Sequence, residues 1–284
     1  MNYKQKYLKY KSKFFKLKNQ NGGSNIYILT WNIWYKIDNN FDKTQYYRMD
    51  NVIKTLKKTK NYDFYLFQEN NLYNEIKSKV PYLYNYRVIN YSKKPTLNLK
   101  TLITEKPNTL NNSLTIFYNK KYNLLNSFGG YLYDDLKLSN GRGYVCGIFN
   151  KLDNPDYIYC IISIHQGHKK GNNFNKSIYK IQQDKQILYP RYKFNRIIIG
   201  GDYNNNNLLD QNYTIFNKRL YNVPKSKINP TCCIPNKIKF TQKIDYIFDS
   251  ERIDTNSRYD YKIKSTDLDY NSSDHKPVIY KLRS

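Results

Sequence analysis

RIIIGGDYNNNN, residues 196 to 207, is the stretch of sequence that decides the predicted fold. Three consecutive isoleucines run into two glycines, an aspartate and a file of asparagines. This pattern predicts a fully buried β-strand that ends abruptly in a polar loop. Asp202 therefore lies at the carboxyl end of a strand, the edge of the sheet where layered α/β proteins collect their active-site residues.

The chain has 284 residues, enough for one large domain with a substantial core, and a formal net charge of +26. Such a large net positive charge favours a polyanionic partner, either nucleic acid or an anionic membrane surface. However, 39 of the 48 basic residues are lysine, and asparagine, isoleucine and tyrosine are also abundant. These residues have AT-rich codons, so the charge permits nucleic-acid binding without demonstrating it.

Residues 1–24 are expected to form a leader and linker that precede a domain at 25–284. Tyr7, Tyr10 and Phe14 recur at helical spacing among lysines, which is the pattern of an amphipathic helix. One interpretation is a disordered basic leader, because so short a helix is barely stable alone. The other is an arm that binds nucleic acid, a membrane surface or another protein. The leader's composition also resembles the openings of proteins from giant DNA viruses.

No apolar run in the sequence approaches the ~18 residues of a membrane span, and nothing near its start resembles the apolar core of a signal peptide. The four cysteines lack the paired spacing of a zinc site, which favours reduced structural thiols. We therefore expect a soluble, intracellular monomer, located in the host cytoplasm or the virion if its source is viral.

Strand and helix patterns are interspersed along the whole domain. Beyond residues 196–202, strands are expected at 26–35, 62–70, 113–119, 131–138, 144–150, 157–168, 243–249 and 275–282. Helices are expected at 43–60 and 177–188, with a short one near 213–221. Asn140-Gly141 predicts a hairpin turn. Such mixing of strands and helices predicts an α/β protein.

Polar groups that suit metal or phosphate chemistry stand where five of these strands begin or end. They are Asn32, Glu69, His165, Asp202 with Asn204, and Asp274 with His275. Carboxylate and amide oxygens are the ligands that Mg²⁺ prefers, so Mg²⁺ is the expected ion and Mn²⁺ the alternative. A neutral imidazole beside a carboxylate can take a proton from water near neutral pH, which makes His275 and Asp245 the candidate acid–base pair.

Six short motifs, in this order and at these separations, resemble those of the endonuclease/exonuclease/phosphatase superfamily, whose members have the DNase I-like fold. They are LTWNIWY, LFQEN, SIHQG, IGGDYN, KIDYIF and SSDHKPV. The resemblance covers nearly the whole chain after the linker, and GDYN and SDHKP are the most specific of the six. It implies a four-layer α/β sandwich, in which two packed mixed β-sheets are flanked by helices. It also implies cleavage of phosphoester bonds with a divalent metal, usually Mg²⁺.

The resemblance implies roles for the matching residues. Asn32 and Glu69 would hold the metal ion, with Asp274 near it. Asp202 and Asn204 would position the attacking water and a phosphate oxygen.

The histidines complete this implied site. His165 would donate to the phosphate, and His275, oriented by Asp245, would be the base or a transition-state donor. We favour His275 over Asp202 as the base, because a histidine paired with a carboxylate titrates nearer neutrality than an aspartate beside a cation. His165 stands where abasic-site endonucleases of the superfamily usually have tyrosine. This favours the branches with histidine there: DNase I-like nucleases, deadenylases, tyrosyl-DNA phosphodiesterases and neutral sphingomyelinases.

Three further residues have a weaker claim to bind substrate. Arg142 could reach a phosphate, although arginines at hairpin turns are more often solvated. His168 could make a second phosphate contact or be a solvated loop residue, and Thr231 could lie near the site or serve a structural turn. Asp249 is interpreted as a surface charge.

The leading prediction is a Mg²⁺-dependent phosphodiesterase, and specifically a nuclease acting on DNA or RNA. The first alternative is a lipid phosphoesterase acting on sphingomyelin or a phosphoinositide headgroup, with the leader as its membrane arm. The second is a non-catalytic nucleic-acid-binding protein that keeps the fold, which the complete set of site residues disfavours.

Overall fold

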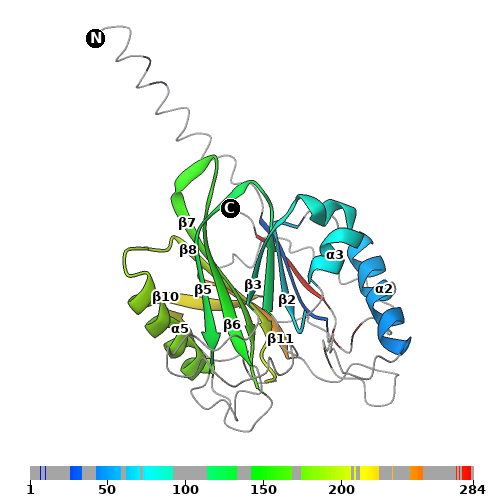
Figure 1. Cartoon of the computed structure of the whole chain (residues 1–284). Coiled ribbons are helices and arrows are strands. Elements are labelled where there is room, and N and C mark those ends of the chain that lie inside the picture. The colour runs from blue at the N-terminus through cyan, green and yellow to red at the C-terminus, as the bar shows by residue number, and fades with distance from the viewer. Residues whose placement is uncertain are drawn as a thin grey trace, which may run out of the picture.

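The computed structural model describes residues 7, 10, 26–33, 43–58, 62–70, 73–91, 114–132, 142–167, 174–205, 208, 212–223, 232, 244–251, 273, 275 and 277–282. These residues build two β-sheets that pack face to face, with helices on both outer faces (Figure 1). The fold class expected from the sequence, a four-layer α/β sandwich, is confirmed.

Each sheet contains one parallel pair of strands among antiparallel ones, so both are mixed. The five-stranded sheet has the order β12 (Val278–Leu282), β1 (Ile26–Asn32), β2 (Phe64–Gln68), β4 (Leu114–Tyr118) and β3 (Arg87–Tyr91). The seven-stranded sheet has the order β5 (Tyr122–Tyr131), β6 (Gly143–Lys151), β7 (Asn154–His165), β8 (Arg196–Asp202), β11 (Asp245–Asp249), β10 (Lys218–Val223) and β9 (Tyr213–Ile215). The parallel pairs are β1 with β2 and β7 with β8.

Three hydrophobic cores separate the four layers. The helices α2 (Lys43–Lys58) and α3 (Tyr73–Lys79) and the 3₁₀ helix η1 (Pro81–Asn85) share one core with the outer face of the five-stranded sheet. The helix α5 (Phe174–Leu188) shares another with the outer face of the seven-stranded sheet. The third core lies between the two sheets.

Strand β8 lies at the centre of this arrangement and is buried along its whole length. Ile197 and Ile199 point into the core beneath α5, whereas Ile198 points into the core between the sheets. Because both faces of the strand are covered, its sequence is apolar throughout and lacks the alternation of a half-exposed strand. This explains the run of isoleucines.

The two glycines that follow allow close packing around the strand. A Cβ on Gly200 would lie 2.8 Å from Leu66 Cδ1 of the facing sheet. A Cβ on Gly201 would lie 1.9 Å from the carbonyl oxygen of Ile164 on β7. No side chain fits at Gly201 unless β7 and β8 move apart.

Gly201→Ala is therefore expected to lower the free energy of unfolding by about 3 kcal/mol, the upper end of the usual cost of overpacking, because the clash is with backbone. Urea unfolding followed by circular dichroism measures this. Gly167→Ala is the matched control, since a Cβ there would meet only Arg142 Cγ at 3.7 Å. Equal losses in the two variants would show that close strand packing does not account for the glycine.

Some sequence expectations need correction, and others fall outside the described residues. The short helix expected near 213–221 is wrong, because this segment forms the antiparallel β9–β10 hairpin. Its turn residues Phe216 and Asn217 have φ of 48° and 62°, the conformation of a tight hairpin turn. The strand expected at 131–138 lies mostly outside the described residues, as does the Asn140-Gly141 turn, and β5 precedes it instead.

Asp249, expected at the surface, is fully buried and forms an ion pair with Arg196, with Arg196 Nη2 2.6 Å from Asp249 Oδ2. Cys146 and Cys160 are free and buried, as expected. Cys232 is disulfide-bonded, so the expectation of reduced thiols is wrong for this residue. Among the described residues, no helix combines the length and the apolar character needed to cross a membrane.

Candidate active site

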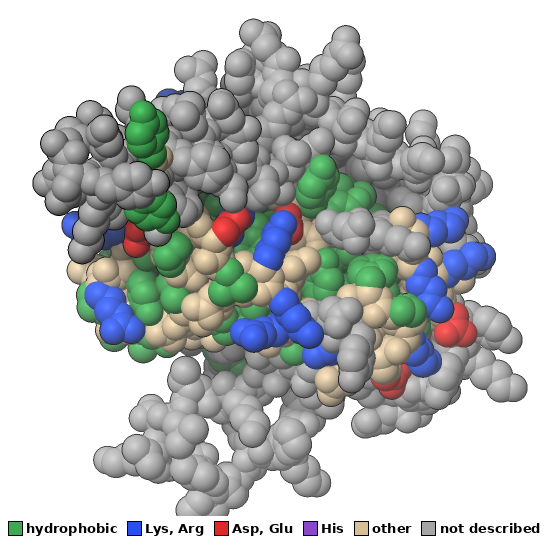
Figure 2. Space-filling model, turned by 90° about the horizontal axis from the view of Figure 1, so that it is seen from above, with side chains coloured by type: hydrophobic (Ala, Val, Ile, Leu, Met, Phe, Trp, Pro, Cys, Tyr) green, Lys and Arg blue, Asp and Glu red, His purple; other side chains and the backbone are tan. Residues whose placement is uncertain are grey.

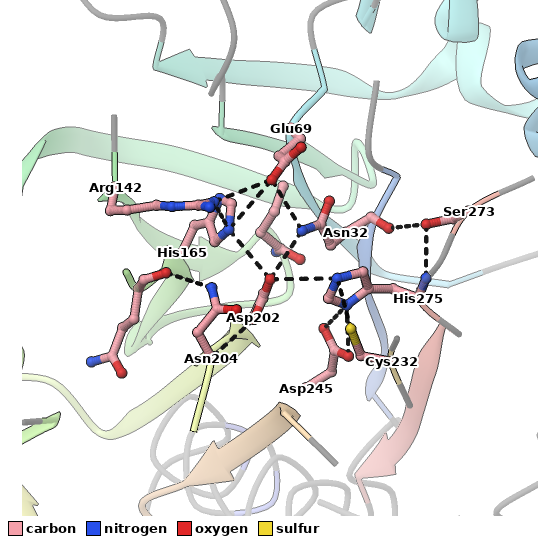
Figure 3. Close-up of polar contacts among 12 residues, drawn as sticks. Asn32, Glu69, Arg142, His165, Asp202, Asn204, Cys232, Asp245, Ser273 and His275 are labelled. Atoms are coloured by element: carbon pink, nitrogen blue, oxygen red, sulfur yellow. Dashed lines mark hydrogen bonds and ion pairs between the residues drawn. The ribbon is translucent and has the colours of Figure 1, made fainter. Parts of the chain in front are cut away.

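Three neighbouring strands of the seven-stranded sheet place candidate residues side by side at one edge. His165, the last residue of β7, is the register partner of Asp202, the last residue of β8. Asp202 is also the register partner of Asp245, the first residue of β11. The sheet register alone therefore aligns three residues that are far apart in the sequence (Figure 3).

The five-stranded sheet contributes two more candidate residues from the facing side. Asn32 ends β1, and Glu69 follows β2 directly. Asn32 Nδ2 donates to Asp202 Oδ2 over 3.0 Å and lies 3.5 Å from Glu69 Oε1. His165 Nε2 lies 3.3 Å from Asp202 Oδ2 and 3.6 Å from Glu69 Oε1. All four side chains are buried and form one cluster that joins the two sheets.

His275 completes the cluster and is held in one orientation. Its Nδ1 lies 2.9 and 3.0 Å from the two carboxylate oxygens of Asp245. Because Nδ1–H donates to this carboxylate, Nε2 is the acceptor nitrogen of the neutral ring. Nε2 lies 3.7 Å from Asp202 Oδ2 and 3.3 Å from Cys232 Sγ. The expected pairing of His275 with Asp245 is present.

Two of the site residues have strained backbone conformations. Glu69 and Asn204 have φ of 52° and 49°, in the left-handed region that residues other than glycine rarely adopt. Asn204 is held there by two hydrogen bonds: its backbone N–H donates to Asp202 Oδ1 over 2.9 Å and its Nδ2 donates to the Gln166 carbonyl over 2.6 Å. Such strain is typical of functional sites, where it aims a side chain that the regular strand would direct elsewhere.

The charges of the cluster keep Asp202 ionised. Burial alone would raise the pKa of Asp202, but His275, His165 and Arg142 outweigh burial and hold that pKa well below its usual range. Burial lowers the pKa of His165, and the Arg142 guanidinium lowers it further, although Asp202 acts in the opposite direction. This lowering of the pKa favours the neutral imidazole of His165.

The donor atoms of the cluster fit a hard divalent cation. Glu69 Oε2 and Asn204 Oδ1 are buried oxygens that find no hydrogen-bond partner among the described residues, an arrangement that is rare unless a ligand is bound there. Asp202, Asp245 and His275 offer further donor atoms that lie within 4.8 Å of one another. Carboxylate and amide oxygens are the ligands of Mg²⁺ and Mn²⁺.

Arg142, a weak candidate for binding substrate, lies inside the site and is buried, so the alternative of a solvated turn arginine does not hold. It precedes β6, next to the register partner of His165, and its Nη1 donates to Glu69 Oε1 over 3.1 Å. The same nitrogen contacts both ring nitrogens of His165. Asp274, His168 and Thr231 lie outside the described residues.

Sequence reasoning overlooked the residues that hold the site in place, although they stand inside the quoted motifs. Gln68 Nε2, at the end of β2, donates to Ser163 Oγ on β7 over 3.0 Å. This hydrogen bond links the two sheets next to the site. Ser273 Oγ donates to the Asn32 carbonyl over 2.7 Å and accepts from the His275 N–H over 3.0 Å. Trp31 Nε1 donates to the His275 carbonyl over 2.8 Å.

No family model and no curated protein matches the chain. Among solved structures, an endonuclease/exonuclease/phosphatase from Bacteroides vulgatus is similar at 19% sequence identity and a TM-score of 0.62, covering 92% of this chain and 99% of its own. The human nocturnin catalytic domain with bound sulfate anion matches at 14% identity and a TM-score of 0.61, covering 90% and 93%. ANGEL2, a 2′,3′-cyclic phosphatase, matches at 13% identity and a TM-score of 0.59, covering 90% and 94%.

The chain therefore has the DNase I-like fold of the endonuclease/exonuclease/phosphatase proteins, as the six motifs led us to expect. The similarity extends over almost the full length of both chains in each comparison.

Proposed function

We propose that the protein is a phosphoester hydrolase that requires a divalent metal ion, Mg²⁺ or Mn²⁺, and that it cleaves phosphodiester bonds of nucleic acid. The observation that carries this proposal is the buried cluster in which Glu69, Asn32 and Asp202 meet the His275–Asp245 pair. The residues proposed as metal ligands, proton acceptor and hydrogen-bond donors thus lie close together, which is what metal-assisted hydrolysis requires. The structural neighbours support it, because they include a 2′,3′-cyclic phosphatase and a domain with a bound sulfate anion.

Glu69 and Asn32 would hold the metal ion, together with Asp274. The buried Glu69 Oε2, which has no hydrogen-bond partner within the described part of the chain, supports this assignment. A divalent cation bound there would polarise the phosphate and offset the negative charge that develops on it. For Asp274 the assignment rests on the sequence motif alone.

His275 would take the proton from the attacking water. Its Nε2 is the acceptor nitrogen, because Nδ1–H donates to Asp245. Asp202 is a poor proton acceptor at neutral pH, since its pKa is held well below the usual range. Asp202 would instead orient the water, with Asn204 beside it on the strained turn.

His165 would donate a hydrogen bond to a non-bridging phosphate oxygen. It is fully buried, and the shift of its pKa favours the neutral ring, which still carries one N–H. A donor fixed in advance stabilises developing charge at little cost of reorganisation.

The charge of +26 supports a nucleic-acid substrate over a small phosphate ester. On the face seen in Figure 2, Lys and Arg side chains are more numerous than Asp and Glu in the described part of the chain, but they are spread across it. The path of a bound strand is therefore not defined by charge alone. The lipid alternative draws support from Tyr7 and Tyr10, which are 58% and 71% exposed.

A single substrate panel tests the proposal. The purified protein with Mg²⁺ is incubated with single- and double-stranded DNA and RNA, and with sphingomyelin and phosphoinositide vesicles. Cleavage of DNA or RNA that EDTA abolishes supports the nuclease. Hydrolysis of a phospholipid with all nucleic acids left intact would replace it by the lipid phosphoesterase, and metal binding without any hydrolysis would favour the non-catalytic binder.

Deleting residues 1–24 is expected to leave turnover of a small phosphodiester unchanged and to weaken binding to long nucleic acids by about tenfold, because the leader is rich in lysine. Turnover of bis(p-nitrophenyl) phosphate and fluorescence anisotropy of a labelled oligonucleotide measure the two effects. Equal loss of both would mean that the leader is part of the folded domain.

A further inference from the structure

Arg142 is almost enclosed by the site, although sequence reasoning placed it at an exposed turn. Its side chain is 11% exposed and the carboxylate that it contacts belongs to a side chain that is 6% exposed. In Figure 3 the guanidinium lies alongside His165 and points at Glu69. Arginine side chains are rarely buried unless they are paired, so the burial of Arg142 against a proposed metal ligand indicates a specific role.

The scaffold around Arg142 fixes the course of its side chain. The neighbouring Gly143 is packed against β5 so closely that a Cβ there would lie 2.6 Å from the Gly130 carbonyl oxygen. On the other side, the stem of Arg142 passes Gly167, where a Cβ would be 3.7 Å from Arg142 Cγ. The guanidinium is therefore directed into the site by the start of β6.

The charge balance of the cluster depends on this residue. Glu69, Asp202 and Asp245 are buried acidic side chains. Among the described residues of the cluster, Arg142 is the one with a permanent positive charge. A buried carboxylate needs such a partner, so Arg142 offsets the charge of Glu69.

Arg142 and a metal ion would use the same carboxylate. Glu69 Oε1 accepts from Arg142 Nη1, whereas Oε2 has no hydrogen-bond partner in the residues that the structure describes. A divalent cation held by Glu69 would repel the guanidinium that donates to the same buried carboxylate, because repulsion between like charges is strong in a buried site. Binding of the cation and the Arg142–Glu69 ion pair therefore oppose each other.

We propose that Arg142 is a catalytic residue that competes with the metal ion for Glu69 and, once displaced from that carboxylate, binds a phosphate oxygen of the substrate. The phosphate contact rests on the proposed function, whereas the competition for Glu69 does not. The ion pair offsets the charge of the buried Glu69 carboxylate. When Glu69 is taken up by a cation, the guanidinium is left to donate to the next anion in the site, for which its planar fork is suited.

The test measures metal affinity and turnover separately. Mn²⁺ binding is followed by electron paramagnetic resonance, which counts free Mn²⁺ without any substrate. Arg142→Gln is expected to bind Mn²⁺ about tenfold more tightly, because the opposing charge is gone. At saturating metal, its kcat on a phosphodiester is expected to fall about a hundredfold, the usual effect of losing one charged donor.

Three matched variants show whether the change in Mn²⁺ affinity is specific to the charge of Arg142. Arg219→Gln makes the same change of net charge at an exposed position on β10 and should leave Mn²⁺ affinity as in the wild type. Arg142→Lys keeps the charge and should retain wild-type affinity, and it serves if Arg142→Gln fails to fold. Glu69→Gln should lose Mn²⁺ binding altogether.

Unchanged or weaker Mn²⁺ binding by Arg142→Gln would overturn the competition. If Arg142→Gln does not fold, an Arg142→Lys affinity that differs tenfold from the wild type overturns it instead. Unchanged kcat at saturating metal would overturn the phosphate contact. A wild type that binds no Mn²⁺ overturns both. A wild type that binds Mn²⁺ but cleaves no phosphodiester contradicts the proposed function, and the affinities still decide the competition.

Discussion

Replacing His275 with alanine is expected to lower kcat on a phosphodiester by about a thousandfold, within the range for loss of a general base. KM should change little, because the contacts proposed for the phosphate come from His165, from Arg142 and from the metal ion. The loss of kcat follows from the geometry of His275. Its Nδ1–H donates a hydrogen bond to Asp245, which leaves Nε2 as the proton acceptor next to Asp202.

Steady-state kinetics at saturating Mg²⁺ measures this effect, and circular dichroism melting confirms folding. Asp245→Asn is the graded variant, since it keeps the size of the side chain but can no longer favour the correct tautomer of His275. It should lose about a hundredfold in kcat. Retention of kcat within tenfold in His275→Ala would exclude His275 as the base.

Asp202→Asn is expected to lower kcat by about a thousandfold while the protein remains folded. The amide keeps the shape of the side chain and an oxygen that accepts from the Asn204 N–H. However, it removes the negative charge next to His165 and His275. The attacking water then loses its anionic partner.

Asp249→Asn provides the control for removing a buried carboxylate, because Asp249 lies at the opposite end of β11 and pairs with Arg196. Urea unfolding should show a loss of about 3 kcal/mol, the usual cost of breaking a buried ion pair, with kcat of the folded protein unchanged. If Asp249→Asn lowers kcat as much as Asp202→Asn does, the effect is one of folding and not of chemistry.

The polar residues at the strand ends could be predicted from the sequence. Buried strands appear there as runs of apolar residues, and each run stops at a polar residue. Strand β8 and Asp202 illustrate this. In the structure, the register of β7, β8 and β11 places His165, Asp202 and Asp245 side by side.

What escaped prediction depends on distances across the sheets. Gln68 and Ser163 are separated by 95 residues, and only the packing of the two sheets brings their side chains to 3.0 Å. Arg142 reaches Glu69 for the same reason. The edge strand β5 is mostly half-buried and shows little alternation, so its sequence lacked a strand signal.

The central claim is that a metal ion and the cluster around Asp202 together cleave a phosphodiester. The most direct test follows cleavage of fluorescent single-stranded DNA and RNA oligonucleotides by the wild type in Mg²⁺, in EDTA, and in EDTA followed by excess Mg²⁺. We predict cleavage, its loss and its return, with none at any stage for Asp202→Asn on the same timescale. Cleavage that persists in EDTA, or equal cleavage by Asp202→Asn, would contradict the account.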